Sequence, residues 1–423
     1  MRRPTSFMRT TATAPRPADG TVLFLAQFTA YVLLFALAVV AQSGLLKVIA
    51  NVYAVVIFGL VAFAWMTRAH PPSRWATAVV VCWLVYMTGI ACSLIVNPAH
   101  VLWGDLVKLS LAPAFLIFGA AFERSRGAAF LWQRPIVRVL FGLLVVVPLL
   151  TWAAQLVQSG FQVDGVRETS IFANRNNAAV YAVTLLGIYT VITGKPLRSL
   201  LLFMAVGVMF GTLGVLLAVV IALALTVARP RELGLLLALV VAAAAGYALA
   251  PTFGPFARIT PVVDSMRLLL EGRINLHTVT FAELVLALKT SDLSFIFRLK
   301  HWVDLLSEFA RADAYHWLFG FGVGSSIRLS DMHLVPHNDY LRYLFEFGVV
   351  TLAGFVGMIG LVLARCGRRW ETVPLLVVVV YLFSENLTTN YTAIAFFYFT
   401  AGVLSERLAA AARAAAMPPT AAP

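Results

Sequence analysis

Long apolar runs separated by short polar connections fill most of this sequence. Twelve runs reach or approach the length that a helix needs to cross a bilayer, about 20 residues. They cover residues 22–41, 46–66, 76–96, 105–122, 139–158, 176–194, 199–211, 213–228, 233–250, 338–364, 372–385 and 391–405. The seventh and eighth runs meet at Gly211-Thr212-Leu213-Gly214 and form either two short helices or one tilted helix. The pattern predicts an all-α polytopic membrane protein with about 12 transmembrane helices.

One polar stretch, residues 251–336, is too long to be a simple connection between spans. Within it, apolar residues recur at three- and four-residue steps over 281–288 and 295–309, which predicts amphipathic helices. We expect their apolar faces to lie on the bilayer or on the membrane helices. The chain thus divides into an N-terminal tail at 1–21, nine spans within 22–250, the loop at 251–336, three spans within 337–408 and a C-terminal tail at 409–423 with little expected order.

Composition and charge agree with this division. Of the 423 residues, 61% are hydrophobic and only 12% are charged, which excludes an ordinary soluble domain. The net charge of +13 comes largely from arginines before the first run and in alternate connections, so the positive-inside rule predicts cytoplasmic termini and an outer location for the loop at 251–336. This spread over short connections also disfavours a nucleic-acid-binding protein. The three cysteines show no metal-binding spacing and indicate no disulfide framework.

The most unusual polar group lies where the long loop returns to the membrane, at Leu334-Val335-Pro336-His337-Asn338-Asp339-Tyr340-Leu341. Proline fits the first turn of a helix, so we expect Pro336 to open the tenth span and His337 to lie in its first turn. The positive helix end would keep the imidazole neutral, and a neutral imidazole can act as a general base. The alternative is that His337 only caps a membrane helix at the headgroup level.

Three further polar segments belong to the same membrane face. An arginine opens the sixth span within Asn174-Arg175-Asn176-Asn177, where it either binds a ligand or extends to the headgroups. Arg298 shares a helix face with Trp302 on the loop, and is either a binding group or an ordinary surface arginine over an aromatic ring. The turn Gly320-Phe321-Gly322-Val323-Gly324-Ser325-Ser326 has the wrong spacing for a nucleotide-binding loop. We expect this turn to let the backbone approach the site closely.

Other kinds of site have weaker support. Asp331, His333 and His337 could suggest a metal site, but Pro336 interrupts any helix that would place the two histidines together. Four acidic residues of the loop leave a glycoside hydrolase open without favouring it: Asp264, Glu271, Glu283 and Asp292. Acidic residues are almost absent from the centres of the spans, which argues against a proton-coupled transporter.

Together these segments resemble the O-antigen ligase and O-antigen polymerase superfamily of bacterial inner membranes, over nearly the whole chain. The matching motifs, in chain order, are Asn174-Arg175-Asn176-Asn177-Ala178, Arg298-x-x-x-Trp302, Leu318-Phe319-Gly320-Phe321-Gly322 and Pro336-His337-Asn338-Asp339-Tyr340-Leu341. The chain departs from the family at Leu213-Gly214, where relatives often carry Ser-Arg. The resemblance would place a contact between an arginine and an anion at this position, and this chain has no arginine there.

The resemblance implies a GT-C-like fold and glycosyl transfer on the periplasmic side. The donor would be a glycan on undecaprenyl diphosphate, and no metal or other cofactor is expected. The acceptor would be a sugar hydroxyl of lipid A–core for a ligase, or of another lipid-linked repeat for a polymerase. The chain length and the single outer loop resemble the ligases more. A transporter of lipid-linked oligosaccharides and a membrane scaffold are the rival classes, but polar groups gathered on the outer face favour an enzyme.

The resemblance also implies roles for individual residues. His337 would accept the proton of the acceptor hydroxyl. Arg175 and Arg298 would bind the diphosphate, with Arg167 as a weaker third candidate. The amides of Asn174 and Asn338 would contact the substrate or orient the catalytic ring.

Overall fold

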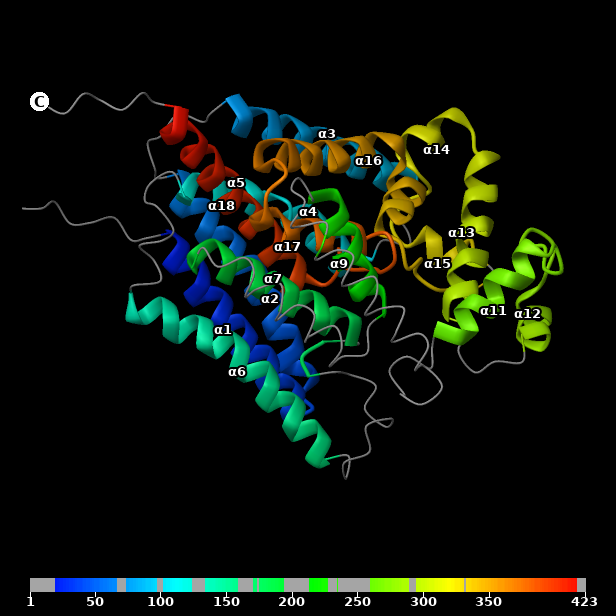
Figure 1. The fold of residues 1–423 in the computed structure, drawn as a ribbon, viewed down its shortest axis with the longest axis horizontal. Coiled ribbons are helices and arrows are strands. Elements are labelled where there is room, and N and C mark those ends of the chain that lie inside the picture. Colours follow the sequence, from blue (N-terminus) through cyan, green and yellow to red (C-terminus); the bar gives the residue numbers. More distant parts are fainter. Residues whose placement is uncertain are drawn as a thin grey trace, which may run out of the picture.

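The structure, a computed structural model, is helical wherever it shows regular elements (Figure 1). It describes residues 20–66, 74–96, 102–123, 134–158, 170–172, 175–193, 213–226, 234, 259–288, 294–330 and 332–416. Seven helices in these ranges are long and apolar enough to cross a membrane. The prediction of an all-α polytopic membrane protein is confirmed to that extent.

The seven candidate spans are formed by α1 (Gly20–Val40), α2 (Gly44–Met66), α3 (Arg74–Val96), the pair α4 (Trp103–Leu111) and α5 (Ala114–Glu123), α6 (Pro135–Gln158), α16 (Asp339–Cys366) and α18 (Tyr391–Ala416). The helices α4 and α5 are separate because Pro113 lacks the amide hydrogen that would continue the first into the second.

The other predicted runs fare differently. Three coincide with shorter or less apolar helices: α7 (Arg175–Thr193), α9 (Leu213–Thr226) and α17 (Val373–Tyr381), which follows the 3₁₀ turn η5 (Trp370–Thr372). The runs at 199–211 and 233–250 lie outside the described residues, apart from Gly234. The count of twelve spans therefore stays a prediction.

The helix α18 forms the centre of the bundle. In its apolar stretch 83% of the residues are buried, against 22% for α2 at the periphery. Its backbone lies directly against α5, because a Cβ at Gly402 would fall 2.2 Å from the carbonyl oxygen of Leu116, and a Cβ at Gly119 would fall 2.2 Å from that of Phe399. Such contacts through small residues are how membrane helices gain van der Waals packing without a hydrophobic driving force.

Five short helices stand at one end of the bundle, on the side away from the end of α18 (Figure 1). They are α11 (Ile259–Leu270), α12 (Phe281–Leu288), α13 (Ser294–Ala310), α14 (Ala314–Phe319) and α15 (Ser325–Arg328). A small core of Leu305, Phe309, Leu341 and Phe345 joins α13 to α16. Both predicted amphipathic segments are thus helices, and α13 packs on a membrane helix.

The glycine-rich turn lies directly against the backbone of α16. Gly320 and Gly348 both have positive φ angles, 73° and 75°, and α16 is kinked at Gly348. A Cβ at Gly320 would lie 2.3 Å from the carbonyl carbon of Glu346. The amide of Phe321 donates to the Phe345 carbonyl at 2.9 Å, and that of Gly322 to the Glu346 carbonyl at 2.9 Å. The turn is therefore hydrogen-bonded to the kink in α16.

Two expectations about helix ends are corrected. The tenth predicted span, α16, begins at Asp339 and not at Pro336, so His337 lies before the helix. Asn338 is the N-cap, and its side chain accepts a hydrogen bond from the amide of Leu341 at 3.0 Å. An asparagine satisfies a free amide at this position, which proline cannot do. At the other end of the chain, α18 continues to Ala416, well into the tail for which we expected little order.

Candidate functional site

A buried carboxylate, Glu385, joins three segments that are far apart in the sequence. It lies in the short connection between α17 and α18, and its side chain is 3% exposed. One oxygen, Oε1, accepts hydrogen bonds from Arg298 Nη2 at 2.6 Å and from Asn176 Nδ2 at 2.6 Å. The other, Oε2, lies 3.3 Å from Nδ1 of His337. We call these four residues the Glu385 cluster.

The histidine of this cluster reaches the wall of a pocket. Its side chain is 41% exposed, and it lines a pocket. An ionised carboxylate only accepts hydrogen bonds, so in a neutral ring of His337 the donor to Glu385 is Nδ1, and Nε2 carries the lone pair. A base whose ring is held by a carboxylate is the arrangement found in catalytic triads.

Asn338 and Asp339 build the support for this histidine. Asn338 is 5% exposed and uses its side-chain oxygen as the α16 N-cap, so it does not face the pocket as a substrate contact. The fully buried Asp339 accepts from the amides of Leu387 and Thr388 at 2.6 and 3.1 Å, and from the Thr388 hydroxyl. These bonds fasten the connection that carries Glu385 to the start of α16.

A second set of buried ions lies next to the first. Arg342 is 1% exposed, and its Nε is 3.1 Å from Glu346 Oε2, itself 0% exposed. The two Nη atoms reach Asp105 Oδ2 at 3.1 Å and Asn386 Oδ1 at 3.2 Å. Ser326 donates its hydroxyl to the other oxygen of Glu346. This Arg342 cluster joins α4, α15 and α16 to the residue that follows Glu385.

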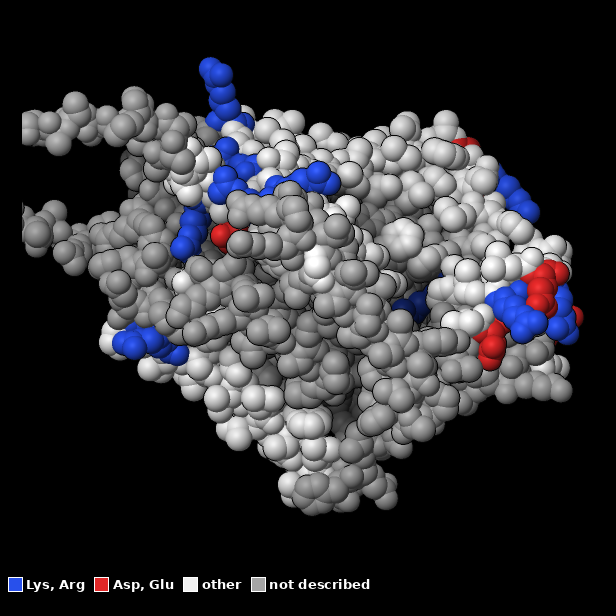
Figure 2. Space-filling view, in the orientation of Figure 1, with Lys and Arg blue, Asp and Glu red and all other residues white. Residues whose placement is uncertain are grey.

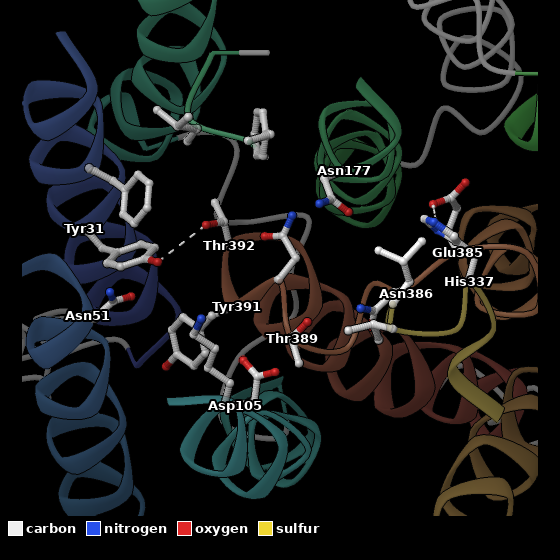
Figure 3. Close-up of a pocket in the computed structure, with 17 residues that line it drawn as sticks. Tyr31, Asn51, Asp105, Asn177, His337, Glu385, Asn386, Thr389, Tyr391 and Thr392 are labelled. Atoms are coloured by element: carbon white, nitrogen blue, oxygen red, sulfur yellow. Dashed lines mark hydrogen bonds and ion pairs between the residues drawn. The ribbon is translucent and has the colours of Figure 1, made fainter. Parts of the chain in front are cut away.

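The pocket has a volume of about 490 Å³, within the usual range for small-molecule sites. Figure 3 shows His337 and Glu385 at one end, with Asn386, Asn177 and Thr389 between them and the far end. The far end is formed by residues of α1 and α2. The site is therefore an elongated cavity with the partly exposed imidazole of His337 at one end.

The predicted binding residues are found in different states. Arg298 and His337 contact the same carboxylate, Glu385. One N–H of the Arg298 guanidinium therefore already donates to that carboxylate. Arg175 is the first residue of α7, and its side chain lies outside the described part of the structure. Arg167 and Asn174 also lie outside the described residues. In the asparagine-rich segment it is Asn176 that reaches Glu385.

A second histidine, His301, is buried beside the site on the same face of α13 as Arg298. It is 3% exposed, and its Nε2 has no hydrogen-bond partner among the described residues. Burial and the nearby His337 lower the pKa of His301 to about 4, although a hydrogen bond to the Ser326 backbone opposes them. His301 is therefore neutral at physiological pH and adds no positive charge next to His337.

Sequence reasoning overlooked Glu385, although a signal was present. It stands in the polar run Ser384-Glu385-Asn386-Leu387-Thr388-Thr389-Asn390, between two apolar spans and on the same predicted membrane side as His337. Among the described residues, no group of three or more histidine, cysteine, aspartate or glutamate side chains could hold a metal ion. Asp331, one of the three residues considered for a metal, lies outside those residues.

No family model matches the chain, and no curated protein is significantly similar to it. The function of the site is therefore inferred from its geometry and from the motifs quoted above.

Proposed function

We propose that this protein is a membrane glycosyltransferase of the O-antigen ligase type. In this proposal it transfers O-antigen polysaccharide from undecaprenyl diphosphate to a sugar hydroxyl of lipid A–core, on the periplasmic face of the Gram-negative inner membrane. The observation that carries the proposal is the His337–Glu385 pair at the mouth of a pocket, at the end of a bundle of apolar helices.

The surface charge supports the orientation. Basic side chains stand mostly alone at the end of the molecule away from α11–α15, whereas at α11 and α12 they are mixed with acidic ones (Figure 2). One mixed group is Arg267 and Arg273 around Glu271. The positive-inside rule then favours a cytoplasmic location for the basic end and for both termini, and a periplasmic location for the pocket.

The chemical step follows from the histidine. His337 Nε2 accepts the proton of the acceptor hydroxyl while that oxygen attacks the anomeric carbon of the donor. The bond from the anomeric carbon to the diphosphate oxygen breaks, and undecaprenyl diphosphate leaves with its electron pair. A single displacement of this kind inverts the anomeric centre. Glu385 keeps the ring in place and stabilises the imidazolium that forms, as the aspartate does in a triad.

The leaving diphosphate needs fixed positive charge because its own charge grows as the bond breaks. Arginine suits this role, since its planar guanidinium binds phosphate oxygens with two parallel hydrogen bonds. Arg298 still has N–H groups beyond the one that Glu385 accepts. We assign the remaining charge to Arg175 and Arg167, whose segment leads into α7 beside Asn176. With fixed cations in these places, the reaction requires no metal ion.

The test is reconstitution of purified protein with lipid-linked O-antigen and lipid A–core, without added metal or nucleotide. Wild type should place glycan on lipid A–core, and His337→Ala should lower the rate by about 10²–10⁴-fold while remaining folded. The control is His277→Ala, an exposed histidine of the α11–α12 connection, which should keep wild-type activity.

Two results would change the proposal. Glycan that lengthens on the lipid carrier would identify a polymerase instead of a ligase. Full activity of His337→Ala would show that the histidine has no catalytic role, and would overturn the mechanism.

A further inference from the structure

The pocket continues well beyond the catalytic histidine, and its far end has chemistry of its own. Four polar side chains line the cavity beyond the Glu385 cluster, from its middle to its far end: Asn51 of α2, Lys108 of α4, and Thr389 and Asn390 of the connection before α18. None of these side chains has a hydrogen-bond or ion-pair partner among the described residues. We call these four residues the distal subsite.

The location makes these free polar groups costly. Asn51 and Lys108 belong to helices that are apolar and long enough to cross a membrane. Polar and ionisable groups within membrane helices are expensive unless they have a partner or line a cavity, and they usually mark a binding site. Asp105, three residues earlier on the same helix, is already paired with Arg342. The ammonium of Lys108 is therefore available to a ligand.

The aromatic residues around the distal subsite are fixed in position. The Tyr391 hydroxyl donates to the carbonyl of Ala54 at 3.0 Å, and the Tyr31 hydroxyl is 3.5 Å from the hydroxyl of Thr392. Figure 3 shows both tyrosines at the end of the pocket opposite His337. Side chains that are already bound in this way offer rigid ring surface at no further cost in conformational entropy.

The combination selects one class of ligand. Two amides and a hydroxyl can both donate and accept, which matches a molecule that carries several hydroxyl groups. The aromatic rings match the apolar faces of a sugar ring. The one ammonium matches one negative charge. A prenyl chain would leave the amides and the ammonium without partners, and a bare phosphate would leave the amides and the rings unused.

We propose that the distal subsite binds a saccharide unit with an anionic substituent, a phosphate or a carboxylate, and that Lys108 pairs with that substituent. This inference rests on the proposed function, because it takes the distal subsite to hold part of the same substrates whose reaction occurs at His337. The saccharide belongs either to the acceptor or to the donor glycan, and the kinetic experiment below separates the two.

The first experiment measures binding alone, on the full-length protein in detergent. The probes are a phosphorylated core oligosaccharide freed of lipid, and the same oligosaccharide after dephosphorylation, titrated calorimetrically at constant salt. Wild type should bind the phosphorylated form about tenfold more tightly, as expected for one charge-assisted hydrogen bond. Lys108→Ala should remove this preference, and Lys108→Arg should keep most of it. Asn51→Ala should weaken both forms equally, by about two- to tenfold.

The matched control is Arg273→Ala, which removes an exposed cation outside the pocket and should leave both affinities unchanged. An unchanged preference in Lys108→Ala would overturn the proposal. Equal affinity of wild type for the two oligosaccharides would rule out a phosphorylated acceptor and leave only the donor glycan, and an unchanged KM for the donor in Lys108→Ala would then overturn the proposal.

The second experiment identifies the source of the saccharide. If it is the acceptor, Lys108→Ala raises KM for lipid A–core and leaves KM for the lipid-linked donor unchanged; if it is the donor, the reverse holds. Both results support the distal subsite, whereas an unchanged KM for both substrates contradicts it. If the binding preference is found but no substrate pair gives turnover, the subsite stands and the proposed transferase activity fails.

Discussion

Two clusters of charged side chains lie side by side in this protein, and they differ in whether a titratable group reaches the pocket. Both contain an arginine held by carboxylates, and neighbouring residues of one connection, Glu385 and Asn386, belong to one cluster each. In the Arg342 cluster the arginine is 1% and Glu346 is 0% exposed. In the Glu385 cluster the carboxylate is 3% exposed, but one of its partners is the imidazole of His337, which is 41% exposed.

The Arg342–Glu346 pair is closed to a substrate, although Asp105 and Asn386, which hold Arg342, line the pocket. We therefore assign the pair to the support of the fold. In the Glu385 cluster the His337 imidazole lines the pocket, whereas the carboxylate that orients it is buried away from water. The comparison teaches that burial of an ion pair alone is a poor sign of function. A better indication of a functional site is a titratable side chain that lines a cavity and is oriented by a buried charged residue.

The largest expected effect on stability comes from the buried Arg342–Glu346 pair. Arg342→Met leaves Glu346 buried without its counter-charge, and such losses cost about 3–5 kcal/mol. We expect a lower thermal unfolding temperature for the purified protein in detergent. The double variant Arg342→Met/Glu346→Gln removes both charges and should recover part of the loss. A single variant as stable as wild type would show that the cluster is not a structural support.

A smaller loss is expected where the glycine-rich turn meets the kink in α16, next to Glu346. Gly320→Ala forces a side chain into a positive-φ conformation and against backbone atoms of α16. The conformational strain alone is worth about 1–3 kcal/mol. The control is Gly360→Ala within α16 itself, where an added Cβ meets nothing within 4 Å. Equal unfolding temperatures for the two variants would contradict the close approach.

The smallest effect concerns pH and sharpens the contrast between a buried and an exposed imidazole. Because burial lowers the pKa of His301 to about 4 from the usual 6.5, the unfolded chain binds its proton first as the pH falls. Stability is therefore lost between about pH 6.5 and pH 4. At pH 5 the loss from this group amounts to roughly 2 kcal/mol. His301→Gln should reduce the drop in unfolding temperature between pH 7 and pH 5, and an unchanged drop would contradict the assignment.

The sequence predicts the structure best where an element forms from the residues of one continuous segment. Apolar runs predict membrane helices because each run must satisfy its own backbone hydrogen bonds in lipid. The seven candidate spans were predictable in this way, and the amphipathic periodicity of 281–288 and 295–309 predicted two of the five loop helices. His337 and Arg298 were recognisable because such residues are costly at a membrane border.

The contacts between segments were not predictable in the same way. Glu385 is 48 residues from His337, 87 from Arg298 and 209 from Asn176, so only the fold shows that they meet. From the sequence alone, Arg342 and Glu346 would also be costly in a membrane span, and only the fold shows that they are paired. The start of α16 was placed wrongly because Pro336 and Asn338 compete for it, and the cap formed by Asn338 prevails.

The central claim is that Glu385 acts on the reaction through His337. A double-mutant cycle of His337→Gln, Glu385→Gln and the combined variant, measured as kcat/KM for glycan transfer, tests it most directly. If Glu385 works through the imidazole, the combined variant should be about as slow as His337→Gln alone, as is found for catalytic residues that act as a unit. Losses that multiply in the combined variant would contradict the claim, because Glu385 would then act independently of the histidine.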